Sequence, residues 1–204
     1  MRPWAVALLL VCLPAGDGRG AAAPPPRWRI DVARSWLSVR ANRAGLLSPV
    51  LHDHDFRPSV WSGTIGLDPP KVEVDVATAS LEDHEAGLSA EDRRKVREQL
   101  LGPTILDAQR FGQIVFKGDR VEDVRRGDHA LEATLLGTLT LHGRERPVRV
   151  PVSATWTPDR LLASGRFSFR QSDFGIRPFS SHLGTVAVRD EVTIELRFVA
   201  APAP

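Results

Sequence analysis

The segment ALEATLLGTLTLHGRERPVRVPVSATW, residues 130–156, decides the fold. Apolar residues occupy every second position of residues 130–141, which is the period of a strand with one buried face. The same alternation runs through residues 147–156. Between them, residues 142–146 (HGRER) are typical of a hairpin turn. The segment therefore predicts two long antiparallel strands, each with one apolar face.

Further strands are expected on both sides of this hairpin. Residues 71–77 and 191–199 alternate as regularly, and four shorter segments are less regular, namely 35–41, 61–68, 111–118 and 161–169. Turn signals at 68–70 and 157–160 separate neighbouring segments. About eight strands with mostly short connections predict an all-β fold, either an antiparallel sandwich or a barrel.

One segment departs from the two-residue period. Ser89 precedes AEDRRKVREQLL, and Asp92 stands three positions after Ser89, as in a helix-capping box. Gly102 and Pro103 then end the pattern. The segment predicts a single helix over roughly residues 90–101, crossing between strands.

The N-terminal segment has the composition of a secretory signal. The chain has 204 residues, 42% of them hydrophobic, a length and composition that suit one domain. Its formal net charge of +2 does not favour a nucleic-acid partner. An apolar run at residues 4–15 is followed by a stretch rich in Gly, Ala and Pro. We expect a signal peptide over 1–23, removal of the only cysteine with it, and a single domain over 24–204. No later run is long enough for a transmembrane helix, so the protein is expected to be periplasmic or secreted.

Motifs of enzymes are absent from the sequence. It contains no Gly-x-Ser-x-Gly, no His-Glu-x-x-His, no phosphate-binding Gly-rich loop and no Cys-x-x-Cys. Nothing in it indicates catalysis, and we expect a protein that is not an enzyme and has no cofactor.

The segment HDHD, residues 52–55, has metal-like spacing. On a strand, His52 and His54 would project to the same side about 6.5–7 Å apart. Two imidazoles hold a metal weakly, so a third ligand such as His142 or His182 would be needed. The alternative is a polar strand end whose histidines form hydrogen bonds to neighbouring groups.

Three segments in the second half of the chain resemble the YceI-like lipid-binding family. GTLTLHGRERPVRVPV (137–152) matches its G-x-L-T-h-x-G-x-x-x-P-V pattern, where h is apolar, SDFGI in 165–176 contains its D-F-G, and DEVTI in 188–196 matches D-x-V-x-I. The segment 105–118 is similar to the family's stretch before an I-x-F strand, with Gly112 where proline is usual. LHDHDF resembles the Gly-His-x-His of a histidine-motif subgroup, with leucine in place of the glycine.

The resemblance implies an eight-stranded antiparallel barrel, lipocalin-like, with one accessory helix. It also implies that the lumen holds an isoprenoid-type ligand, such as a polyprenyl lipid or a quinone tail. Taking one residue from the lumen-facing side of each of seven different strands, the candidate ligand contacts are Ile65, Val74, Phe116, Leu139, Val150, Phe167 and Ile194. We expect Phe56 and Phe174 at the barrel mouth.

Two other interpretations stay open at this point. One is an exported metal-binding barrel that uses His52 and His54. The other is a structural or stress-related barrel with a solid core and a protein partner. A homodimer is compatible with all three interpretations.

Overall fold

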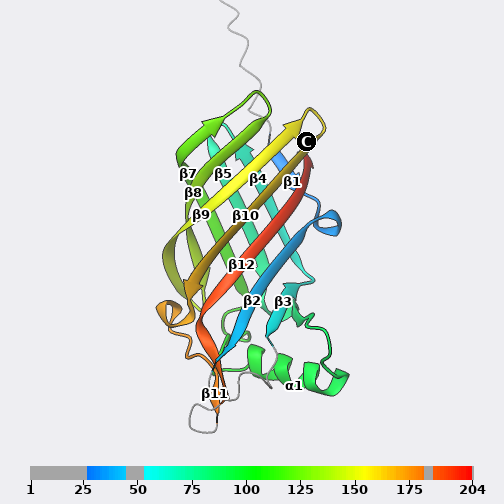
Figure 1. Cartoon of the computed structure of the whole chain (residues 1–204), viewed down its shortest axis with the longest axis vertical. Coiled ribbons are helices and arrows are strands. Elements are labelled where there is room, and N and C mark those ends of the chain that lie inside the picture. The colour runs from blue at the N-terminus through cyan, green and yellow to red at the C-terminus, as the bar shows by residue number, and fades with distance from the viewer. Residues whose placement is uncertain (1–26, 45–52, 182–185, 204) are drawn as a thin grey trace, which may run out of the picture.

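The computed structural model describes residues 27–44, 53–181 and 186–203. Its main body is one antiparallel sheet that closes on itself as a barrel (Figure 1). In pairing order its strands are β1 (Arg27–Ile30), β4 (Trp61–Leu67), β5 (Pro70–Ala77), β7 (Gln113–Arg126), β8 (Ala130–Leu141), β9 (Arg144–Thr157), β10 (Arg160–Arg170) and β12 (Val186–Pro202). Pairing of β12 with β1 closes the ring at eight strands, which confirms the predicted eight-stranded antiparallel barrel.

Three further strands continue the sheet at one end of the barrel. They are β2 (Trp36–Ala44), β3 (His54–Pro58) and β6 (Leu81–Asp83), which pair in the order β12, β2, β3, β6. A short strand β11 (Ser180–Ser181) also pairs with β12. The sequence did not predict β1, β3, β6 or β11, because segments of two to five residues are too short to show a two-residue period.

The hairpin between β8 and β9 is tighter than its sequence predicted. The turn consists of His142 and Gly143 alone, and Leu141 pairs directly with Arg144. Both turn residues have positive φ, 51° and 70°, as the favoured two-residue hairpin turn requires. Arg144 to Arg146, expected in the loop, therefore belong to β9.

The single α-helix, α1 (Ala90–Leu101), lies where the sequence predicted it. The side chain of Ser89 accepts a hydrogen bond from the backbone N–H of Asp92 at 3.0 Å, which is the expected N-terminal cap. The guanidinium of Arg93 donates to the backbone carbonyls of Asp83, Glu85 and Leu88. The helix is thereby tied to the loop that follows β6.

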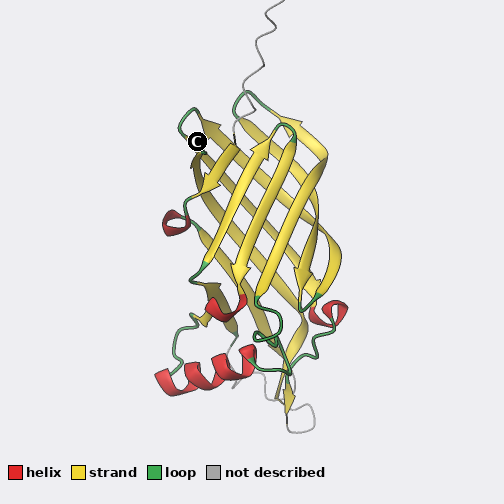
Figure 2. Ribbon diagram, turned by 180° about the vertical axis from the view of Figure 1, so that it is seen from behind, coloured by secondary structure: helices red, strands yellow, loops and turns green. Residues whose placement is uncertain are grey.

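The two ends of the barrel differ (Figure 2). The helix end carries α1, the His142–Gly143 turn and the β2–β3–β6 extension. The hairpin end carries the turns between β4 and β5, β7 and β8, and β9 and β10, together with the pairing of β1 with the end of β12. None of the helices in the described residues is long and apolar enough to cross a membrane.

Candidate functional site

The barrel encloses a cavity of about 360 Å³. Its lining comes from the lumen-facing half of each alternating strand, for example Val72, Val74 and Val76 of β5. Apolar residues make up nearly all of the lining; the polar side chains are those of Asp68, Arg126 and Gln171. The apolar faces that the sequence predicted therefore surround a space and are not packed solid.

The cavity is long and runs between the two ends of the barrel. On β8 it is lined from Leu131 to Leu141, a run of about 34 Å at about 3.4 Å per residue. A strand tilt of about 40° reduces this to roughly 26 Å along the barrel axis. The space is suited to an extended chain and much less to a compact ring system.

All seven residues predicted for the lumen line this cavity. Ile65, Val74, Leu139 and Val150 are buried. The remaining three, Phe116, Phe167 and Ile194, are half-buried and face the space itself. Alternation placed them correctly, and contact with a ligand remains a prediction for each.

The two aromatic residues expected at the mouth have different positions. Phe56 of β3 lines the cavity at the helix end and is buried. Phe174, in a 3-10 helix at Gln171–Phe174, is only 1% exposed and does not line the cavity. Its ring packs edge-on against Phe169 with centroids 5.1 Å apart. Phe174 therefore supports the lining from outside.

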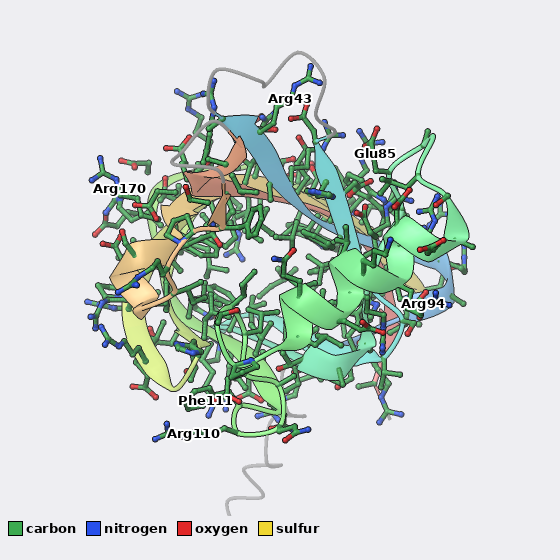
Figure 3. All side chains as sticks on the ribbon, turned by 90° about the horizontal axis from the view of Figure 1, so that it is seen from below. Arg43, Glu85, Arg94, Arg110, Phe111 and Arg170 are labelled. Carbon is green, nitrogen blue, oxygen red and sulfur yellow. The ribbon has the colours of Figure 1, made fainter. Side chains whose placement is uncertain are left out.

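Sequence reasoning missed the residues that line the helix end of the cavity. Leu81, Leu100, Ile105, Leu106 and Ile176 come from β6, α1 and loops. Loop residues follow no period, so alternation could not identify them. Leu100 could have been identified from its place on the inner side of the predicted helix. Figure 3 looks onto this end, where α1 crosses one side and the side chains of Arg94, Arg110 and Arg170 point outward around the rim.

The described part of the histidine motif, residues 53–55, lies at a polar strand end at the same end of the barrel. His54 begins β3, and its Nδ1 lies 2.6 Å from Oδ2 of Asp83, whose side chain is fully buried. The imidazole also stacks on Phe56, with ring centroids 5.4 Å apart. Among the described residues no group of three His, Cys, Asp or Glu side chains is placed to hold a metal. His52 and His182 lie outside the described residues.

Two carboxylates in this region are held ionised. Burial alone would raise the pKa of Asp83, but hydrogen bonds from His54 and from the backbone N–H of Glu85 lower that pKa below its usual value. Burial likewise opposes ionisation of Asp55, whose pKa is lowered by hydrogen bonds from Arg57 and Ser38. These hydrogen bonds and ion pairs join β2, β3 and β6 at this end of the barrel.

The motifs in the second half of the chain also have structural roles. Asp190 accepts hydrogen bonds from the backbone N–H and the hydroxyl of Ser172, at 2.8 and 2.6 Å. Gly175 has a φ of 74° and ends the 3-10 helix, a conformation that glycine adopts without strain. His142, considered as a third metal ligand, has its Nδ1 3.3 Å from the carbonyl oxygen of Phe174. These contacts hold the connection between β10 and β12 against the barrel end.

Comparison with solved structures shows the same fold in bacterial proteins. BcnA of Burkholderia cenocepacia aligns with a TM-score of 0.64 and 20% identity, covering 84% of this chain and 99% of BcnA. A polyisoprenoid binding domain of Saccharophagus degradans, implicated in plant cell wall breakdown, aligns with a TM-score of 0.62 and 12% identity, covering 86% and 98%. A Campylobacter jejuni YceI protein aligns with a TM-score of 0.54 and 16% identity, covering 72% and 83%.

Comparison of the sequence itself identifies the family. No curated protein matches the chain. Residues 28–200 match the YceI-like domain, a range that covers the barrel ring except for the first residue of β1 and the last two of β12. The chain therefore belongs to the family of YceI-like domain proteins.

Proposed function

We propose that this protein binds an isoprenoid-type lipid or quinone in its barrel lumen and carries it outside the cytoplasm, without catalysing a reaction. The observation that carries the proposal is the long cavity of about 360 Å³ with its almost wholly apolar lining. A solid-core structural barrel would have no such space.

The chemistry of the lining suits a hydrocarbon chain. Burial of each CH₂ group contributes about 0.8 kcal/mol, so a tail of several isoprene units has a large driving force for entering the lumen. The described part of the lining has three polar side chains, those of Asp68, Arg126 and Gln171, and they do not form a pair of nucleophile and base. A binding protein needs no such pair, which accounts for the absence of catalytic motifs in the sequence.

Similarity to other family members adds support of a weaker kind. The Saccharophagus degradans relative is described as a polyisoprenoid binding domain, and it shares this fold over 86% of the chain. The apolar run and the small residues of the first 23 positions support export. Both arguments are independent of the cavity.

The test is organic extraction of protein purified from the exported fraction of its own organism, followed by mass spectrometry. We expect a stoichiometric isoprenoid lipid or quinone. The matched variants are Ala163→Phe and Leu162→Phe, adjacent positions on β10. Ala163 lines the cavity, whereas Leu162 is 41% exposed on the outer face.

The two variants distinguish lipid held in the lumen from lipid that adheres elsewhere on the protein. If the lumen holds the lipid, the amount of lipid extracted per protein falls in Ala163→Phe and is unchanged in Leu162→Phe. An extract without lipid from well-folded wild-type protein refutes the proposal. Recovery of the protein solely from the cytoplasmic fraction refutes its export.

A further inference from the structure

Among the cavity-lining residues in the described part of the chain, three are exposed. They are Asp68, Val124 and Arg126, and all three belong to the hairpin end. Asp68 lies in the turn between β4 and β5, and the other two lie near the tip of the β7–β8 hairpin. Val124 is 48% exposed although it lines an apolar cavity. The cavity therefore reaches solvent at the hairpin end.

An irregularity in β7 creates this arrangement. Strict alternation after Val121, which lines the cavity, would direct Asp123 and Arg125 inward. The register with β8 instead shifts between Glu122 and Arg125, and Asp123 has a φ of 54°. This β-bulge changes the face on which the following residues lie, a common use of bulges beside binding sites. Val124 and Arg126 line the cavity as a result.

The displaced residues confirm the change of face. Arg125 pairs with Glu132 at 3.6 Å, and Asp123 accepts a hydrogen bond from Thr134, both on the outer surface. In the described part of the chain, the side chains of Arg126 and Asp68 have no hydrogen-bond or ion-pair partner. A cation and an anion are thus placed at the rim of an apolar cavity, both available to a ligand.

The helix end lacks these properties. Its lining residues in the described part of the chain are buried or half-buried, including Leu81, Leu106 and Ile176. Gln171 is the polar side chain there, and it already donates a hydrogen bond to the carbonyl oxygen of Arg189 at 2.8 Å. No unsatisfied polar group on the described lining of this end is offered to a ligand.

We propose that the lipid enters through the hairpin end, tail first, and that its polar head stays between Arg126 and Asp68. This inference rests on the proposed function and adds the direction of binding and the class of head group. The guanidinium of Arg126 donates hydrogen bonds to oxygen atoms of the head. Asp68 offsets that charge, repels an anionic head and accepts a hydrogen bond from a hydroxyl. The head is therefore an uncharged, oxygen-bearing group, not a phosphate.

The test compares three probes on lipid-free, full-length protein by calorimetric titration. Geranylgeraniol carries a hydroxyl head, geranylgeranyl phosphate carries an anionic head, and squalene has no polar head. We expect Arg126→Ala to weaken geranylgeraniol binding about tenfold, equivalent to about 1.4 kcal/mol. Squalene binding should change by less than about twofold. Asp68→Asn should tighten binding of the phosphate probe.

Two matched variants locate the head group. Arg125→Ala removes the neighbouring guanidinium on the outer face and should leave all three affinities unchanged. Gln171→Ala tests the opposite end of the cavity and should have no effect specific to the head group.

The possible results distinguish this inference from the proposed function. Saturable binding of the probes with no loss in Arg126→Ala, or a loss equal for squalene and geranylgeraniol, overturns the head-group site alone. A head-specific loss in Gln171→Ala places the head at the helix end and overturns the direction of binding. Failure of wild-type protein to bind any probe refutes the proposed function as well.

Discussion

Enlarging a side chain inside the lumen tests whether the cavity exists in solution. Ala163 of β10 is half-buried and lines the cavity, opposite Phe198 and Ala154 on the neighbouring strands. Ala163→Leu places three more carbons in this space. In a packed core the same change would cost about 1–3 kcal/mol through strain.

The expected sign in an open lumen is the opposite. Three buried carbons at about 0.8 kcal/mol each contribute at most about 2.4 kcal/mol. Ordering the leucine side chain costs about 0.5–1 kcal/mol. We therefore expect the free energy of unfolding of lipid-free protein to rise by about 1–2 kcal/mol.

The assay is equilibrium unfolding in urea, with the lipid removed beforehand because a bound ligand itself stabilises the fold. The control is Gly137→Ala, also an enlargement on the lumen side of a strand. A Cβ at Gly137 would lie 2.5 Å from the carbonyl oxygen of Lys117 and 2.7 Å from the Phe116 ring, so this variant should lose stability. A loss of about 1 kcal/mol or more in lipid-free Ala163→Leu would show that the lumen is packed and would refute the cavity.

Other predictions concern groups that hold the helix end together. Folding lowers the pKa of Asp83, so the ionised Asp83 carboxylate stabilises the folded state. This stabilisation is complete above the ordinary Asp pKa of 3.8 and is lost as the pH falls through the lowered value. At neutral pH the free energy of unfolding of the wild type should exceed that of Asp83→Asn by about 2 kcal/mol. Urea titrations at several pH values should show this difference vanishing in acid. A difference independent of pH would contradict the pKa argument. Phe174→Ala should cost roughly 3–5 kcal/mol, whereas the half-buried Phe179→Ala should cost much less in the same titrations; equal losses would contradict the placement of Phe174 in the core. Ser89→Ala should cost about 1 kcal/mol and Ser89→Asp should restore it, measured by thermal unfolding; an unaffected melting temperature in Ser89→Ala would show that the cap contributes nothing.

The barrel was predictable because its long strands follow one rule. In β8, in β9 and in β12 from residue 191 on, every second residue faces the lumen, and a period of two over nine or more residues is unambiguous. The helix was predictable because its cap, its apolar positions and its Gly-Pro end agree. The presence of a cavity was not predictable, since alternation shows which residues share a face and does not show whether that face is filled.

The features at the two ends of the barrel escaped prediction for a different reason. Val124 and Arg126 face the lumen because of a bulge whose energetics depend on the partner strand, and a single-strand pattern does not contain that information. The pairing of His54 with Asp83 joins residues 29 positions apart, across β3 and β6, neither of which was predicted. Phe174 was expected at the barrel mouth, but it lies behind the lining, where its ring packs against Phe169, and the sequence pattern does not show this packing.

The pairing of β1 with β12 also affects how the chain folds. Ile30 pairs with Ala200, so the last seam of the barrel joins residues 170 positions apart. Contacts of such separation form late, because the entropy of closing the loop must be overcome first. Until β12 is available the remaining strands form an open sheet with an unpaired edge. If the chain is exported as we propose, this dependence delays closure until transport is complete, so the lumen first becomes a separate compartment after export.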